Sequence, residues 1–94
     1  MIIHLMPGSK PQKPAEPYHA TLSVDGFIHC SYEHQVPKVL ELFFKGAGEV
    51  WGFEILTDKL TSQLRDDPTP LGEAFPHIYG PINPEAFGQL IRFQ

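Results

Sequence analysis

Three short stretches of this chain each place a histidine beside aliphatic residues, a pattern typical of a brief β-strand. They are Ile2–Leu5, Gly26–Ser31 and Phe75–Gly80. Side chains of a strand alternate between its two faces, so each stretch has one apolar face and one polar, titratable face. His4, His29 and His77 occupy the polar faces. The pattern predicts three strands whose imidazoles border a single shared cleft.

The rest of the chain predicts one small α+β domain. At 94 residues it has room for one hydrophobic core, so we predict a single domain over residues 1–94. Five apolar side chains at helical spacing predict one main helix over residues 33–44, and we expect all five to be buried. They are Val36, Val39, Leu40, Phe43 and Phe44. Ser31, just before this helix, is its expected N-cap.

Further strands are predicted where aromatic and β-branched residues cluster, over residues 50–56 and 89–93. Residues 62–66 are expected to be extended and residues 67–72 to form a loop. Segment 7–17 has four prolines in eleven residues, which prevents regular backbone hydrogen bonding. We therefore expect an irregular surface loop there.

Charge and cysteine content exclude several classes of protein. The net charge is −4 and the seven Lys and Arg residues are scattered singly, so we expect no nucleic-acid partner. The single cysteine, Cys30, excludes an intramolecular disulfide and a cysteine-rich zinc module. No apolar run approaches the roughly 20 residues of a membrane span, and the N-terminal residues do not resemble a signal peptide. We expect a soluble cytoplasmic protein without a membrane partner, and the sequence leaves its oligomeric state open.

The three histidines allow three chemical interpretations. His4, His29 and His77 could together bind zinc, although no closely spaced pair of ligands accompanies them. Cys30 could be a nucleophile with a histidine base, although strand alternation directs it toward the core. The third interpretation is a polar cleft that hydrogen-bonds a sugar or phosphate and offers a ring for stacking. Its lining residues would be His4, Phe27, His29, Ser31, His77 and Tyr79.

Two longer motifs carry a resemblance to a known bacterial family. Residues 25–31, Asp-Gly-Phe-Ile-His-Cys-Ser, are followed by Gln35-Val36, and residues 75–82 read Phe-Pro-His-Ile-Tyr-Gly-Pro-Ile. Together with the opening Ile3-His4-Leu5, they make the chain similar to the domain of unknown function 952 family. The resemblance covers nearly the whole chain.

This family is grouped with the ADP-ribosyltransferase-like fold, an α+β domain whose split antiparallel or mixed sheets hold a cleft for NAD. The resemblance implies that His4 hydrogen-bonds the ribose and that His29 and Ser31 line the nicotinamide side, while the His77–Tyr79 strand supplies the third position. It thus implies a small-molecule nucleotide ligand, NAD or a relative, and no metal. The reaction would be ADP-ribosyl transfer or hydrolysis of the nicotinamide bond.

The chain departs from the family pattern in two places. The loop over residues 7–17 replaces a tryptophan-led helix, and Asp66-Asp67 stands near the place of a Trp-Glu pair. Glycosyl transfer passes through an oxocarbenium-like centre that a carboxylate stabilises. Either Asp66 or Asp67 could take the place of the family's glutamate, or the carboxylate is lost. The predicted catalytic set is Asp66 with His4, His29 and His77. Two alternatives remain: a non-catalytic binding or interaction module that has lost the carboxylate, and a metal-dependent hydrolase.

Overall fold

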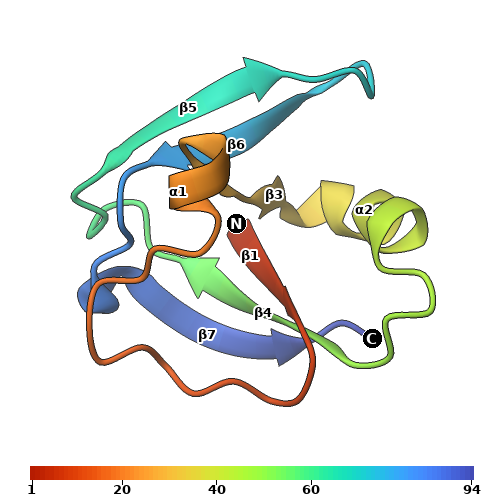
Figure 1. The fold of residues 1–94 in the computed structure, drawn as a ribbon, viewed down its shortest axis with the longest axis horizontal. Helices are drawn as coiled ribbons and strands as arrows, with labels where there is room; N and C mark the ends of the chain where they lie inside the picture. The colour runs from red at the N-terminus through yellow and green to blue at the C-terminus, as the bar shows by residue number, and fades with distance from the viewer.

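The computed structural model describes residues 1–94 and contains two antiparallel sheets (Figure 1). The four-stranded sheet has the order β3-β1-β4-β7 and the three-stranded sheet the order β2-β6-β5. In chain order the strands are β1 (Ile2–Pro7), β2 (Ile28–His29), β3 (Ser31–Tyr32), β4 (Val50–Ile55), β5 (Gln63–Pro68), β6 (Ala74–Tyr79) and β7 (Phe87–Arg92). In Figure 1, β5 and β6 lie together on one side of the molecule, and β1, β4 and β7 lie on the other.

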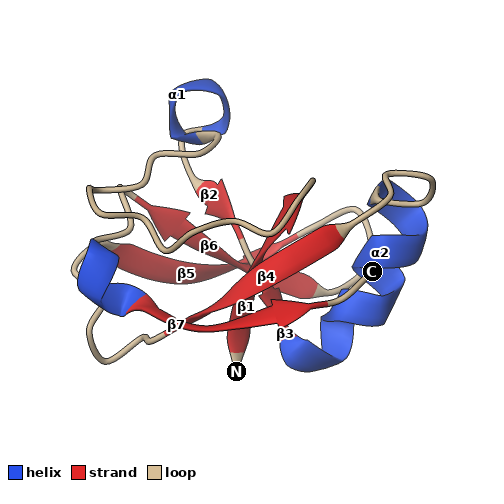
Figure 2. Cartoon of the chain, turned by 90° about the horizontal axis from the view of Figure 1, so that it is seen from below, coloured by secondary structure: helices blue, strands red, loops and turns tan.

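One main helix, α2 (Val36–Phe43), packs at the end of the molecule beside β3 (Figure 2). The short α1 (Leu22–Asp25) and two 3-10 turns, η1 (Glu33–Gln35) and η2 (Pro84–Ala86), complete the fold. No helix is both long and apolar enough to span a bilayer. The predicted α+β class, with antiparallel sheets and one main helix, is confirmed.

The second histidine stretch does not form one strand, because the chain passes from one sheet to the other at Cys30. Ile28 and His29 pair with β6, whereas Ser31 and Tyr32 pair with β1. The Cys30 N–H donates to the Pro76 carbonyl at 3.0 Å and fixes the crossing point. The alternation suggested that the three histidine strands lie side by side in a single sheet, and this is wrong. β2 and β6 are neighbours, and β1 belongs to the other sheet.

A shared core holds the two sheets together. Its buried cluster takes Ile28 and Ile78 from the three-stranded sheet and Ile2 and Phe53 from the four-stranded sheet. Cys30 lies between them and is 4% exposed, which confirms that it faces the core as strand alternation predicted.

Three local predictions were wrong. Ser31 is not a helix N-cap, because it belongs to β3; the Tyr32 N–H is instead capped by Gln35 Oε1 at 3.0 Å. Only Val36 and Val39 of the five predicted helix residues are buried; Leu40 and Phe44 are half-buried, and Phe43, the last residue of α2, is 64% exposed. Asp67 and Pro68 belong to β5 rather than to a loop, because the pairing with β6 extends to Pro68–Ala74.

Candidate functional site

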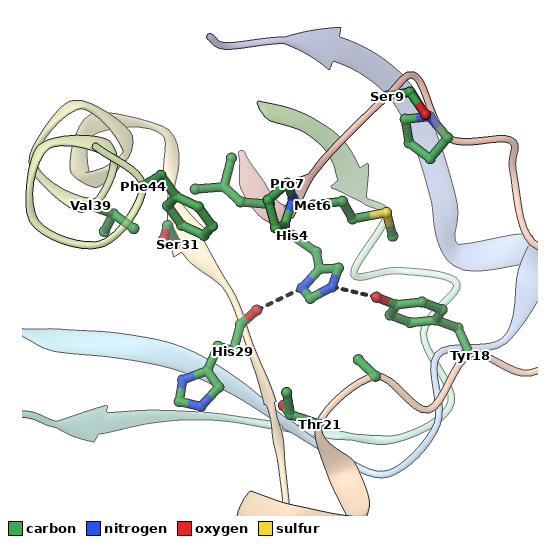
Figure 3. A pocket seen from close by; sticks show the side chains of 13 residues that line it. His4, Met6, Pro7, Ser9, Tyr18, Thr21, His29, Ser31, Val39 and Phe44 are labelled. Atoms are coloured by element: carbon green, nitrogen blue, oxygen red, sulfur yellow. Dashed lines mark hydrogen bonds between the residues drawn. The ribbon is translucent and has the colours of Figure 1, made fainter. Parts of the chain in front are cut away.

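His4 on β1 forms a side-chain hydrogen bond that joins the two sheets. Its Nδ1 lies 2.7 Å from the carbonyl oxygen of His29 on β2, and its Nε2 lies 2.9 Å from the hydroxyl of Tyr18 (Figure 3). His4 is only 7% exposed, although it sits beside an open cavity. Tyr18 is half-buried and is held by backbone bonds in both directions with Ile82.

These contacts fix the protonation of His4. A carbonyl oxygen only accepts, so Nδ1 carries a proton and donates it to His29. Burial lowers the pKa of His4, partly opposed by the bond to His29, so the ring is neutral near pH 7 and Nε2 is an acceptor. The Tyr18 hydroxyl must therefore donate to Nε2. Burial raises the pKa of Tyr18, so this hydroxyl keeps its proton, and its oxygen can still accept a bond from a ligand.

A cavity of about 580 Å³ lies against His4, within the size range of small-molecule sites. We call it the His4 cavity. Its wall takes residues from both sheets, from α2 and from the proline-rich segment (Figure 3). The lining residues are His4, Leu5, Met6, Pro7, Ser9, Pro11, Tyr18, Ala20, Thr21, His29, Ser31, Val39 and Phe44. None of them is a lysine, arginine, aspartate or glutamate.

His29 and His77 face each other across the β2–β6 pair, with ring centroids 5.3 Å apart. Each imidazole is oriented by a carboxylate. His77 Nδ1 lies 2.8 Å from Asp67 Oδ2, and His29 Nε2 lies 3.0 Å from Asp25 Oδ2. Phe27 stacks on the His77 ring with centroids 4.0 Å apart and planes 15° apart.

The Asp67 carboxylate accepts from two side chains, the Tyr79 hydroxyl and the His77 imidazole. These bonds lower the pKa of Asp67, with the Tyr79 bond contributing most, so the carboxylate stays charged near neutral pH. Asp67 therefore holds His77 in the tautomer that is protonated on Nδ1 and leaves Nε2 as the free ring nitrogen.

A second cavity of about 560 Å³ lies next to the first, and we call it the His77 cavity. The two share His29, Ser31, Val39 and Phe44 as lining residues. Its remaining wall comes from the β2–β3 crossing, the end of α2, the end of β5, the β5–β6 connection and β6. These residues are Cys30, Phe43, Pro68, Thr69, Pro70, Leu71, Phe75 and His77.

The structure brings only part of the predicted site together. His4, His29 and Ser31 line the first cavity, and His29, Ser31 and His77 line the second. The side chains of Phe27 and Tyr79 line neither cavity; they pack around the His77 ring or bind Asp67.

Asp66, one of the two candidate carboxylates, also lines neither cavity. It accepts a hydrogen bond from the Tyr32 hydroxyl, which raises the pKa of Tyr32. Its neighbour Asp67 instead makes the contact with a candidate site residue, because adjacent residues of a strand point to opposite faces.

Sequence reasoning missed Tyr18 as a site residue. Nothing local marks it, since it follows a proline-rich segment whose path the sequence leaves undetermined. The one available signal was that Tyr18, an aromatic residue, directly follows a run of polar residues and prolines.

The side chains are not arranged for either of two alternative chemistries, a zinc site or a cysteine nucleophile. No group of three or more His, Cys, Asp or Glu side chains is placed to hold a metal ion, so the three histidines do not form the zinc site considered above. Burial raises the pKa of the Cys30 thiol to about 12, which leaves almost no thiolate to act as a nucleophile near neutral pH.

Comparison with known proteins identifies a family and a fold. The family described as "Protein of unknown function (DUF952)" matches residues 8–89, which include both longer motifs but not His4. No curated protein matches the chain. The crystal structure of protein CC0527 from Caulobacter crescentus aligns with a TM-score of 0.73 at 20% identity, over 99% of this chain and 85% of that one. A double mutant of CC0527 gives a TM-score of 0.72 at 19% identity, with the same coverage. At this identity the likeness shows a shared fold alone.

Proposed function

The chain belongs to the DUF952 family of proteins of unknown function, and on this premise we propose that it binds NAD or a related nucleotide without cleaving it. The nicotinamide and its ribose occupy the His4 cavity, and the remainder of the nucleotide extends toward solvent. One observation carries the proposal: a buried, neutral His4 holds the Tyr18 hydroxyl at the wall of a cavity built from both sheets.

The His4–Tyr18 pair suits a sugar hydroxyl. His4 Nε2 accepts the Tyr18 proton, so the hydroxyl oxygen of Tyr18 is oriented to accept a hydrogen bond from the ribose. Ser31, which lines the same cavity, has a hydroxyl that both donates and accepts. His4 thus acts as a positioning residue and Tyr18 as the residue that touches the ligand.

The charge distribution favours the nicotinamide end of the nucleotide. No cationic side chain lines either cavity, so neither offers a counter-charge for a pyrophosphate. The net charge of −4 repels phosphate and attracts the cationic pyridinium ring of NAD. Phe44 adds an aromatic surface on which such a ring can pack.

The absence of a carboxylate in the cavity walls favours binding over catalysis. Asp66 is bonded to Tyr32, Asp67 to His77 and Tyr79, and Asp25 to His29. None of these three lines a cavity, so none reaches the anomeric carbon of a ribose bound there. An oxocarbenium-like centre in the His4 cavity would find no negative side chain to stabilise it.

A titration followed by NMR tests the binding proposal. Nicotinamide riboside and NAD should both shift the resonances of His4 and Tyr18, with nicotinamide riboside binding at least as tightly, whereas ADP-ribose should bind more weakly. Tyr18→Phe removes the ligand-facing hydroxyl and should weaken binding by roughly three- to tenfold, the value of one hydrogen bond. Tyr32→Phe is the matched control, because its hydroxyl binds Asp66 outside both cavities, and it should bind as the wild type does.

Two outcomes contradict the proposal. Absence of any shift at His4 and Tyr18 with millimolar ligand would exclude binding in this cavity. Release of nicotinamide from NAD by the wild-type protein, measured by chromatography, would show that the protein is an enzyme and that it does not merely bind the nucleotide.

A further inference from the structure

Two buried side chains of the His77 cavity keep a polar atom without a protein partner. His77 is 7% exposed and Ser31 is 5% exposed. His77 uses Nδ1 to bind Asp67, and neither its Nε2 nor the Ser31 Oγ makes a hydrogen bond within the protein. Every fully buried side-chain nitrogen and oxygen of this protein does have a partner. These two atoms therefore keep some exposure, and both residues line the same cavity.

The hydrogen-bonding roles of the two atoms are defined. Asp67 accepts the Nδ1–H of His77, so in the neutral form of the ring Nε2 is an acceptor. The Ser31 hydroxyl can donate as well as accept. A ligand group that donates one bond and accepts another, such as a hydroxyl, can satisfy both atoms.

Apart from His29 and Thr69, whose side chains are already hydrogen-bonded within the protein, the rest of the wall is apolar. Val39, Phe44, Leu71 and Phe75 surround the cavity, and Phe43 stands exposed at its edge. No lysine, arginine, aspartate or glutamate is among the lining residues. An anionic ligand would lose its hydration here without gaining a counter-charge, whereas an aromatic ring would bury apolar surface against phenylalanine and leucine.

We propose that the His77 cavity is a second ligand site, which takes a small uncharged aromatic alcohol. The ring lies among the apolar side chains, and the hydroxyl donates to His77 Nε2 and accepts from Ser31 Oγ. This site does not use His4 or Tyr18, although it shares Ser31 with the His4 cavity. It borders the His4 cavity through His29 and Ser31, so two ligands would lie next to each other.

Binding of phenol and toluene to the wild-type protein tests this site, because the two molecules have nearly the same size and differ in the hydroxyl. Phenol should shift the amide resonances of Ser31, Leu71 and His77 and the ring-nitrogen resonance of His77 Nε2. Toluene should bind roughly three- to tenfold more weakly, by the value of one hydrogen bond. Ser31→Ala should weaken phenol binding by a similar factor and leave toluene binding unchanged.

Ser23→Ala is the matched control, because Ser23 is exposed on α1 and lines neither cavity. Thermal unfolding of both variants checks that the fold is retained. Equal affinity for phenol and toluene, or phenol shifts confined to residues outside the cavity, would overturn the proposal. Neither result would affect the nicotinamide riboside titration, since that readout is at His4 and Tyr18.

Discussion

At the scale of single residues, His4 links protonation to folding. Burial lowers its pKa in the folded state, so at pH values below about 6.5 the unfolded chain binds more protons at this position. Stability contributed by neutral His4 is present above that pH and is lost as the pH falls toward the lowered pKa of the folded state. Each unit between the two pKa values corresponds to about 1.4 kcal/mol.

We therefore expect the free energy of unfolding to decrease between about pH 7.5 and about pH 5, and expect His4→Gln to reduce this dependence. Urea unfolding at the two pH values measures it. His34→Gln, at an exposed position, should keep the wild-type dependence. If the pH dependence of the free energy of unfolding is unchanged in His4→Gln, a group other than His4 causes it. The lowered pKa of Asp67 acts in a different range, since its stabilisation is lost only below about pH 4.

Residue alternation explains which site residues could be predicted. His29 and His77 were expected on a common face, and they are a directly opposed cross-strand pair. His4 was expected on the polar face of its strand, but its partner is a backbone carbonyl in the other sheet. Tyr18 could not be predicted, because its position depends on the path of an irregular proline-rich segment and on an isolated bridge to Ile82.

At the scale of elements, the central strand β4 depends on a glycine. A Cβ at Gly52 would lie 2.7 Å from Ile3 Cγ2 and 2.8 Å from Phe93 Cε2, which is too close for carbon atoms. Gly52→Ala should therefore destabilise the protein by about 1–3 kcal/mol through overpacking beside β1. Chemical denaturation measures the loss.

Gly88→Ala on β7 provides the comparison. A Cβ there would meet the end of the flexible Glu54 side chain and Leu56 at 3.0 Å, and these can move aside. We expect a loss of about 1 kcal/mol or less. Equal losses of stability in Gly52→Ala and Gly88→Ala would show that the packing over Gly52 is loose enough to accept a methyl group.

Most elements follow from local patterns, and the exceptions have a common cause. The strands β1, β4, β6 and β7 lie close to where their apolar and β-branched residues predict them. The division of residues 28–32 between two sheets could not be predicted, because alternation continues through Cys30 while the pairing partner changes. The same long-range effect places Ser31 in a strand instead of at a helix start.

At the scale of the whole molecule, the net charge should influence ligand preference. The protein measures about 31 × 30 × 25 Å, and the Debye length is about 30 Å at 0.01 M ionic strength and about 8 Å at 0.15 M. At low salt the field of the −4 charge should favour cationic nicotinamide riboside over anionic NAD. Raising the salt concentration should narrow the difference between their dissociation constants, which calorimetry can measure. A difference that widens with salt would contradict this account of the charge.

The central claim is that the His4 cavity binds the nicotinamide riboside portion of a nucleotide through the Tyr18 hydroxyl. A crystal structure of the protein with nicotinamide riboside tests it most directly. We predict density for the ligand between the two sheets, with a ribose hydroxyl within hydrogen-bonding distance of Tyr18 Oη and His4 still bonded to the His29 carbonyl. Ligand density elsewhere, or an empty His4 cavity at saturating ligand, would contradict the claim.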